Sequence, residues 1–511
     1  MRAARCAGIT LAATVTVRSA PASTVSNYLV TSQVRLALAV VLAVAPAAGC
    51  ATTSSRPPSV AARISPEALA AQVAEADRLA SRGCYLCLKE AGAVYSHLLT
   101  LSEDAVLIRK ALENNLMVAL REIELRIPDS GARDAADALA PRVLSSYAAF
   151  FAALDALTVP AQTGIDALQL TREERVKVAT ELEKEWPASA MRAYFYLAIA
   201  LTTTRLAELE PKIDAVLATH ARDLSLAYRV QTIGPLFSRE ASRALIGQET
   251  GFGEVHLLLG QRAMLNGNSV DAHRELSRAR QLLPDSASIA RALAGVTMSY
   301  ARYSEALALY EQVLTSWVDP TALLGKAKAL SYLARHEQAI EVLDELLKDL
   351  ENNPGEKYYW RAWNRLQLTQ TQAAYDDALA ALMAMRNNEV YRLAGIASLG
   401  LGRPAEAREY FANAIDMNAG DCDAERFLGD IDAAERSWTP ALAHFRNAVT
   451  CYDGALARMA TDLAKHEKDI SGLSNGLIAS LREELEDAQN LRAVALKNAD
   501  AISTMPGFGG P

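Results

Sequence analysis

The sequence has few of the residues that build disulfide scaffolds, aromatic-rich cores or nucleic-acid surfaces. Six cysteines and 6% aromatic residues are spread over 511 positions. Lys and Arg number 52 against 60 Asp and Glu, so the formal net charge is −8. A nucleic-acid-binding surface needs a surplus of basic residues, and we therefore expect no nucleic acid as a partner. The mild negative charge is interpreted as an anionic coat that aids solubility.

The motifs of enzyme chemistry are also missing. The sequence contains no glycine-rich phosphate loop, no nucleophile elbow and no His-Glu pair of metalloprotease type. Its seven histidines are scattered singly, without the clustering that a metal site needs. We therefore predict a non-enzymatic protein with no catalytic residue, no cofactor and no metal.

What the sequence does contain is alanine and leucine in a repeating pattern. Apolar residues make up 51% of the chain, and alternation of the kind that marks β-strands is almost absent, which favours an all-helical protein. An alanine recurs at steps of 34, 33, 35, 33 and 34 residues: Ala272, Ala306, Ala339, Ala374, Ala407 and Ala441. Twelve residues before each alanine stands a small residue: Gly260, Ala294, Ala327, Ala362, Gly395 and Gly429. Small residues at fixed positions let paired helices approach closely, and a larger residue four places after most of the alanines fills the next gap.

This spacing resembles the tetratricopeptide repeat (TPR), a helix–turn–helix unit of about 34 residues. The resemblance implies an all-α fold, a right-handed α-solenoid of TPR units, with six repeats over 253–451. We interpret 66–252 as irregular helical hairpins with degenerate TPR-like units that cap or extend the array. Residues 452–503 are predicted to form a long C-terminal helical pair, and 504–511 a disordered tail.

Residues 34–49 have the pattern of a signal peptide. Arg35 supplies a positive start, and 36–45 form an apolar stretch too short to span a membrane. The segment ends in Ala-Ala-Gly-Cys, which resembles a bacterial lipobox and implies a lipid on Cys50, although Ala47 stands where that family prefers Leu. An ordinary signal peptide, cleaved after a small-residue triplet, is the alternative. Residues 50–65 then form a polar, proline-containing tether.

The residues on either side of this segment indicate where translation starts and where the protein is located. Residues 1–33 carry arginines without an apolar run, so we interpret them as a spurious or disordered leader, with Val34 as the alternative to Met1 as the true start. Ala51, instead of Asp, follows the cysteine, as in lipoproteins sorted to the outer membrane. The expected location is therefore the cell envelope, at the periplasmic face of the outer membrane.

Four further cysteines fall into two pairs. Cys422 and Cys451 lie on the two antiparallel helices of the sixth repeat, so we predict a disulfide between them. It would close a loop of about 30 residues, worth on the order of 3 kcal/mol. Cys84 and Cys87 have the spacing of a thioredoxin-type motif, but that motif normally opens a helix in a βαβ fold, and no strands are evident. A local structural disulfide and two buried thiols in a helical turn both remain open for this pair.

The TPR resemblance also predicts a binding surface. In TPR proteins the first helix of each repeat lines a concave groove, and its fifth and ninth residues point inward. This register gives the predicted groove residues Arg291, Lys328, Tyr359, Trp363, Arg392 and Arg426. Aromatic and Arg side chains often carry binding energy, so the groove would suit an extended or helical partner segment with some acidic character. The alternative is that Trp360 and one of its neighbours pack against adjacent repeats and that the Arg and Lys residues are ordinary groove residues.

Two functions follow from these patterns. The first is a membrane-anchored scaffold that binds partner proteins of the cell envelope in the groove of the TPR array. The second is a solute- or glycan-handling accessory lipoprotein of a transport system, which the low aromatic content and short connections disfavour.

Overall fold

The computed structural model describes residues 65–144, 211–348 with short gaps at 212, 216, 219–221 and 233–235, then 354–469 and 472–505. Over these ranges the chain is built of helices and turns, without a β-strand. The all-α prediction is confirmed. None of the helices in these ranges has both the length and the apolar character needed to cross a membrane. The predictions for 1–64, including the lipid on Cys50, fall outside the described residues.

The N-terminal part consists of helices that pack as consecutive neighbours. The helices are α1 (Pro66–Ser81), α2 (Tyr85–Leu99), α3 (Ala105–Leu125), α4 (Ala132–Leu139), the 3₁₀ turn η1 (Ala140–Arg142), α9 (Leu224–Thr232) and α10 (Arg239–Gln248). The Ser65 side chain caps α1 by accepting the N–H of Ala68 (3.2 Å), and Pro66 occupies the first helical position. Each of α1, α2 and α3 contacts the next helix, and the part of the 66–252 prediction that falls on 145–210 lies outside the described residues.

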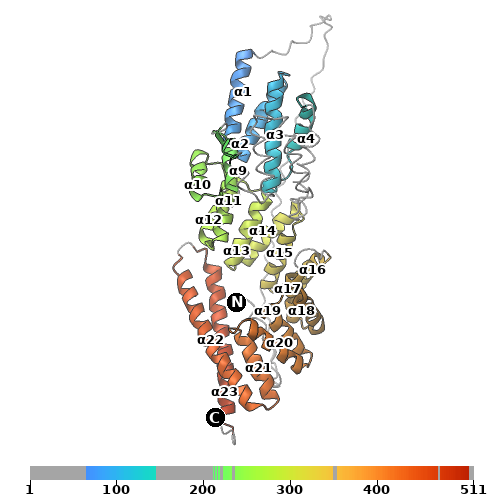
Figure 1. Cartoon of the computed structure of the whole chain (residues 1–511), viewed down its shortest axis with the longest axis vertical. Coiled ribbons are helices and arrows are strands. Elements are labelled where there is room, and N and C mark those ends of the chain that lie inside the picture. The colour runs from blue at the N-terminus through green and yellow to red at the C-terminus, as the bar shows by residue number, and fades with distance from the viewer. Residues whose placement is uncertain are drawn as a thin grey trace, which may run out of the picture. The chain divides into compact units, whose positions relative to one another are not determined.

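The array follows as six pairs of helices, which Figure 1 shows in succession. The pairs are α11 (Gly253–Leu265) with α12 (Ser269–Leu282), α13 (Ala287–Ser299) with α14 (Tyr303–Ser316), α15 (Pro320–Tyr332) with α16 (His336–Leu346), α17 (Pro354–Gln367) with α18 (Thr371–Ala384), α19 (Asn388–Gly400) with α20 (Pro404–Met417), and α21 (Cys422–Ala434) with α22 (Trp438–His466). Each pair also packs on the next pair. We call these pairs units one to six.

The recurrent small residues have the predicted role in helix packing. All six of the recurrent alanines are fully buried. A Cβ added at Gly395 would lie 2.7 Å from the ring of Phe411, and one added at Gly429 would lie 2.8 Å from the ring of Phe445. Real Cβ atoms do not approach other atoms so closely, so the glycine on the first helix makes room for the aromatic ring of the second. One such contact is needed in each helix pair, and this is why the small residues recur about every 34 residues.

The turn inside each unit repeats as well. One residue per turn has a positive φ, from 54° to 72°: Gly267, Ala301, Ala334, Thr369, Gly402 and Arg436. These positions recur at the same steps as the alanines. Only two of the six are glycine, although the left-handed region is unfavourable for residues with a Cβ.

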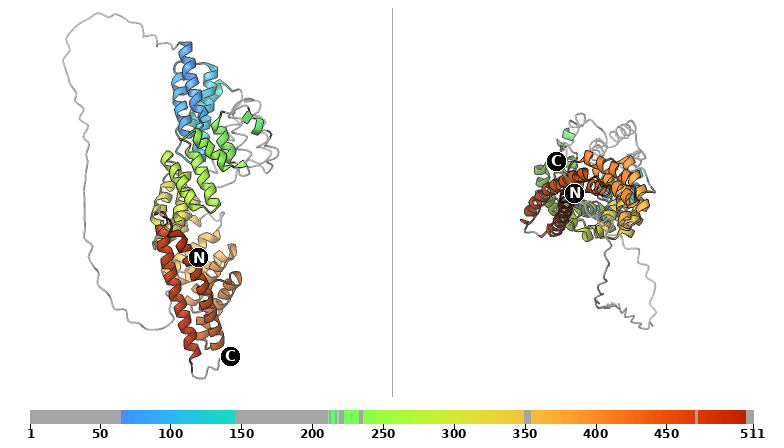
Figure 2. Two further views of the ribbon diagram at one scale, coloured as in Figure 1. Left: turned by 90° about the vertical axis from the view of Figure 1, so that its left-hand side faces the viewer. Right: turned by 90° about the horizontal axis from the view of Figure 1, so that it is seen from below.

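The C-terminal helices differ from the sequence interpretation. Helix α22 runs unbroken through 451–452, where a separate helical pair was predicted to begin. The reason is that its buried stripe of Phe445, Ala448, Tyr452 and Ala455 continues at helical spacing across this point. The second helix of unit six is thus also the first helix of a long hairpin, which α23 (Asn475–Ser503) completes. Figure 2 shows these two helices, coloured red, side by side in both views.

The tip of this hairpin touches unit two. Leu473 is buried in the same apolar cluster as Tyr300, at the end of the first helix of that unit. A Cβ added at Gly476 would lie 2.7 Å from the carbonyl oxygen of Tyr300. The α22–α23 hairpin therefore begins in unit six and returns to unit two.

Candidate binding surface

Three of the predicted groove residues form ion pairs between neighbouring units. Arg291 pairs with Asp319 (3.2 Å), Lys328 with Glu356 (2.5 Å) and Arg392 with Asp421 (2.7 Å). In each pair the basic residue stands on the first helix of one unit, and the acid stands at the start of the first helix of the next. We call them the inter-unit ion pairs.

Two of the acids in these pairs also cap helices. The side chain of Asp319 accepts two backbone N–H groups at the start of α15, and that of Asp421 accepts one at the start of α21. Asp319 also pairs with Arg126, at the end of α3, and so links the N-terminal helices to the array. Burial opposes the charge on Arg392, but Asp421 and Asp423 more than offset it and raise the pKa of the guanidinium. These basic side chains hold units together, and their charge is largely neutralised.

Arg426, the fourth predicted basic residue, lies inside unit six. Its side chain pairs with Asp430 (2.9 Å) one turn along α21 and lies over the ring of Phe427, 4.1 Å from its centroid. The residue is only 6% exposed. Both of these partners lie on α21, the helix that carries Arg426 itself.

The predicted aromatic residues lie in the core of the array. Tyr359 and Trp363 are 7% and 6% exposed and share a cluster with Val390 and Leu393 of the next unit. Both predicted aromatic groove residues therefore pack between repeats. Trp360, which sequence reasoning did not select, is half-buried and more accessible.

A line of half-buried aromatic rings crosses three successive units. Tyr303 stacks on Tyr332 with centroids 4.6 Å apart, and Tyr332 meets the edge of Trp360 at 5.5 Å. The ammonium group of Lys328 lies 5.9 Å from the centroid of Trp360. We call Tyr303, Tyr332 and Trp360 the aromatic line. It is a contiguous partly apolar surface with one cation beside it.

A cavity of about 170 Å³ lies between unit five, unit six and the C-terminal hairpin. Its apolar wall is formed by Ala455, Met459, Ala488 and Leu491 of α22 and α23. Its polar wall includes Arg392 and Asp421, which form one of the inter-unit ion pairs. Sequence reasoning missed this cavity because α23 returns over the array only in the tertiary structure.

The structure contains both cysteine pairs as disulfides. Cys422 and Cys451 are joined with a Cα–Cα distance of 5.3 Å and so tie α21 to α22. Cys84 and Cys87 are joined at the start of α2, with a Cα–Cα distance of 5.0 Å. The carboxylate of Glu249 lies within 4.8 Å of both sulfurs, but sulfurs bonded to each other offer no thiolate to a metal ion.

No protein-family model and no curated protein matches the sequence. Among solved structures, a MamA RS-1 double mutant is 22% identical over 33% of this chain and 96% of its own, with a TM-score of 0.31. YrrB, described as a TPR protein with an unusual peptide-binding site, is 16% identical over 37% of this chain and 97% of its own, with a TM-score of 0.32. PilF of Pseudomonas aeruginosa is 19% identical over 41% of this chain and 95% of its own, with a TM-score of 0.36. Such low sequence identities and TM-scores do not decide a function. The TPR description rests on the 34-residue spacing and the helical pairs of this chain itself.

Proposed function

We propose that this protein is a non-enzymatic, membrane-anchored scaffold whose TPR array binds a segment of a partner protein. The observation that carries the proposal is the aromatic line across units two, three and four. Rigid aromatic side chains supply large contact areas at low entropic cost, and they dominate many protein interfaces. A partner segment with apolar side chains at regular spacing fits this surface.

The acidic character first expected of the partner is not required by this geometry. The inter-unit ion pairs neutralise three of the basic residues that would have attracted an acidic segment. Lys328 lies beside Trp360 but also pairs with Glu356. The proposed contact is therefore mainly apolar, with charge in a secondary role.

Capture of partners by variants of one unit tests the proposal. Trp360→Ala should reduce cross-linked partner recovered from cell envelopes by about tenfold or more, as expected for a central aromatic contact. Met383→Ala is the matched control, because Met383 is a bulky residue of the same unit that is 89% exposed on α18. Hydrogen exchange in α17 must stay near that of the wild type, which separates a lost contact from a lost fold. Equal capture by both variants would refute the site.

The membrane anchor is a separate part of the proposal. It is supported by the lipobox-like Ala-Ala-Gly-Cys sequence that ends at Cys50, and the proposed location is the periplasmic face of the outer membrane. Cys50→Ser should move the protein from the membrane fraction to the soluble fraction, since lipid chains are what hold such a protein at the bilayer. Retention of the variant in outer membranes would contradict the anchor while leaving the scaffold proposal intact.

The cavity favours solute handling as a second candidate function. It combines an apolar wall with polar groups, as small-molecule sites do. Calorimetric titration of the full chain with sugars and small organic acids separates the two functions. Binding that is lost in Leu491→Trp, which would fill the cavity, but kept in Trp360→Ala would favour the second candidate.

A further inference from the structure

The Cys84–Cys87 disulfide lies at the start of a long helix. Cys84 is the N-cap residue of α2, and its sulfur accepts the backbone N–H of Cys87 (3.1 Å). The N-terminus of a helix carries partial positive charge, which stabilises a thiolate. Sequence reasoning set a redox role aside because no βαβ unit was evident, yet the structure supplies the helix start that such chemistry uses.

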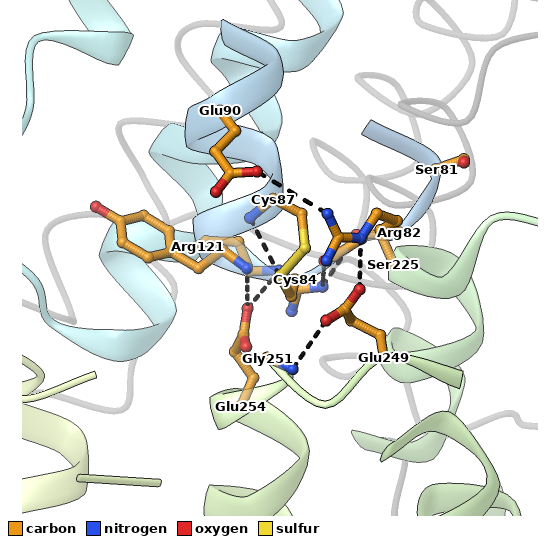
Figure 3. The surroundings of a disulfide bond; sticks show 12 residues. Ser81, Arg82, Cys84, Cys87, Glu90, Arg121, Ser225, Glu249, Gly251 and Glu254 are labelled. Atoms are coloured by element: carbon orange, nitrogen blue, oxygen red, sulfur yellow. Dashed lines mark hydrogen bonds and ion pairs between the residues drawn. A yellow bond between two sulfur atoms is a disulfide. The ribbon is translucent and has the colours of Figure 1, made fainter. Parts of the chain in front are cut away.

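A buried carboxyl group lies beside this helix start. Glu254, on α11, is fully buried, and its Oε1 accepts the N–H of Tyr85, the residue after Cys84 (2.7 Å). Its Oε2 has no hydrogen-bond partner among the described residues. Figure 3 shows this carboxyl group next to Cys84 and Arg121, whose Nε lies 3.8 Å from Oε1. Glu254 is thus a buried acid with one unused oxygen, and it is held against the residue that follows Cys84.

The charges around Glu254 leave it able to carry a proton near neutral pH. Burial raises its pKa to about 7, against the opposing effects of Arg121 and of backbone N–H groups. Glu124, on α3, adds to the increase. The other titratable or charged groups at this junction include Arg82, Tyr85, Glu122, Tyr228, Arg229, Glu249 and Asp285.

Both sulfurs are buried beside an apolar cluster, and the turn at 249–251 forms part of their cover. Cys84 and Cys87 are 1% and 2% exposed. A Cβ added at the half-buried Gly251 would lie 3.5 Å from the sulfur of Cys84, so this residue is part of the cover. Glu249 holds the turn by accepting the N–H of Gly251 (2.8 Å) and by pairing with Arg82 (2.5 Å). Opening this turn would give a reductant access to the Cys84 sulfur without unfolding α2.

A purely structural role explains the pair poorly. The disulfide closes a loop inside one helix start and joins no two elements, whereas Cys422–Cys451 joins α21 to α22. In the chain-entropy picture the stabilisation by a disulfide grows with the length of the closed loop. Cys84–Cys87 therefore adds less to the fold than the other pair.

We propose that Cys84–Cys87 is a redox-active disulfide that exchanges electrons with a dithiol, and that Glu254 is its proton donor. A thiolate of the dithiol attacks the Cys84 sulfur, and the Cys87 sulfur leaves with the electron pair and takes a proton from Glu254. The second thiol of the dithiol then gives its proton to solvent and attacks the dithiol's own sulfur in the mixed disulfide, so that Cys84 leaves as a thiolate that accepts the N–H of Cys87. The cysteine pair gains two electrons, the dithiol leaves as a disulfide, and Glu254 recovers a proton from solvent.

Reduction of the oxidised full-length protein by dithiothreitol, without denaturant, tests this proposal. Free thiols are alkylated at intervals and assigned by peptide mass, so Cys422–Cys451 serves as a reference in the same tube. The Cys84–Cys87 pair should be reduced at least tenfold faster, and its relative rate should change with pH near 7. Reduction of Cys84–Cys87 only in denaturant, or no faster than the reference, would overturn the proposal.

Two glutamate variants separate proton donation from loosening of the structure. Glu249→Gln weakens the cover and should speed the reduction of Cys84–Cys87 severalfold. Glu254→Gln removes the proton donor, so it should slow the reaction about tenfold and flatten the pH profile. If Glu254→Gln instead accelerates reduction as Glu249→Gln does, Glu254 is only a packing residue and the proposed donor is wrong. Should either variant fail to fold, the pH profile of the wild type still decides, since a profile identical to that of Cys422–Cys451 would refute the role of Glu254.

Discussion

At the scale of single residues, the turns of the array hold side chains in an unfavourable conformation. Thr369 has a φ of 57° and Arg436 a φ of 60°, whereas Gly402 occupies the equivalent position in unit five. The Cβ of an L-residue is crowded in this region, and branching at Cβ adds to the cost. The turn is imposed by the two packed helices, which together outweigh the preference of one residue.

Thr369→Gly is therefore expected to stabilise the protein. Removing the Cβ relieves about 1–2 kcal/mol of conformational strain. The greater freedom of glycine in the unfolded chain offsets part of this gain in stability. The net gain should be about 0.5–1 kcal/mol, measured as a rise in the urea midpoint. Gly402→Thr is the converse variant and should lower the midpoint. A lower midpoint for Thr369→Gly would show that its side chain makes a contact that outweighs the strain.

Glu254 should make stability depend on pH. Burial raises its pKa from 4.5 to about 7 in the folded state, so the folded protein binds the proton more tightly than the unfolded chain does. This contribution to stability is fully present below about pH 4.5 and is lost as the pH rises to about 7, by up to about 3 kcal/mol.

The measurement is the difference in urea midpoint between the wild type and Glu254→Gln at pH 5 and at pH 8. The variant cannot ionise, so its midpoint should fall less between the two pH values than that of the wild type. Parallel behaviour of the two proteins would mean that Glu254 keeps a similar pKa in the folded and unfolded states.

At the scale of elements, α22 serves two parts of the fold. Its first half packs in unit six, where Cys451 ties it to α21, and its second half pairs with α23. Gly454 lies between these halves, exposed, and a Cβ there would have only the flexible end of Arg458 nearby, at 3.4 Å. Glycine is the weakest helix former at this junction.

Gly454→Ala should strengthen α22 by up to about 1 kcal/mol, because alanine loses less backbone entropy on forming a helix. Amide exchange in 450–460 that is slower than in the wild type, together with a higher melting temperature, would show this stabilisation. Gly395→Ala provides the contrast, since its Cβ would meet the Phe411 ring at 2.7 Å and overpacking costs about 1–3 kcal/mol. If the two alanines had the same effect, the close approach at Gly395 would not be what selects glycine there.

At the scale of the whole array, the C-terminal hairpin connects units that are distant in the sequence. Leu473 and Gly476 lie against Tyr300, whereas Ala488 and Leu491 of the same hairpin line the cavity beside unit five. Repeat arrays are otherwise stabilised by contacts between neighbouring units. The hairpin adds a long-range contact and couples unit two to unit six.

Gly476→Val should detach the hairpin tip, because a side chain there would collide with the backbone oxygen of Tyr300. Amide exchange measured by mass spectrometry should rise about tenfold or more at 298–303 and 473–480 and stay unchanged in α19. Ala479→Val is the matched control, since Ala479 is exposed on the same helix and the variant introduces the same β-branched side chain. Unchanged exchange in Gly476→Val would mean that the tip contact contributes nothing to the order of either segment.

The sequence alone determined the all-α fold and the pairing of helices inside each unit. Both follow from local rules, because small residues such as Gly395 and large ones such as Phe411 recur at fixed spacing wherever two adjacent helices touch. The separation of 28 or 29 residues between the partners of the inter-unit ion pairs was also present in the sequence, and it could have identified Arg291 and Arg392 as structural. The lipid on Cys50 stays a prediction, since it falls outside the described residues.

Only the tertiary structure decided which of these residues are accessible and what the ends of the array contact. The register of the first helix in each repeat predicted Tyr359 and Trp363 on the binding surface. Packing against the next unit buries both side chains and leaves Trp360 more exposed. The return of α23 to Tyr300 and the hydrogen bond of Glu254 to Tyr85 depend on residues far apart in the chain. No repeat period encodes such contacts, because they are set by how successive units stack and where a long helix then turns back.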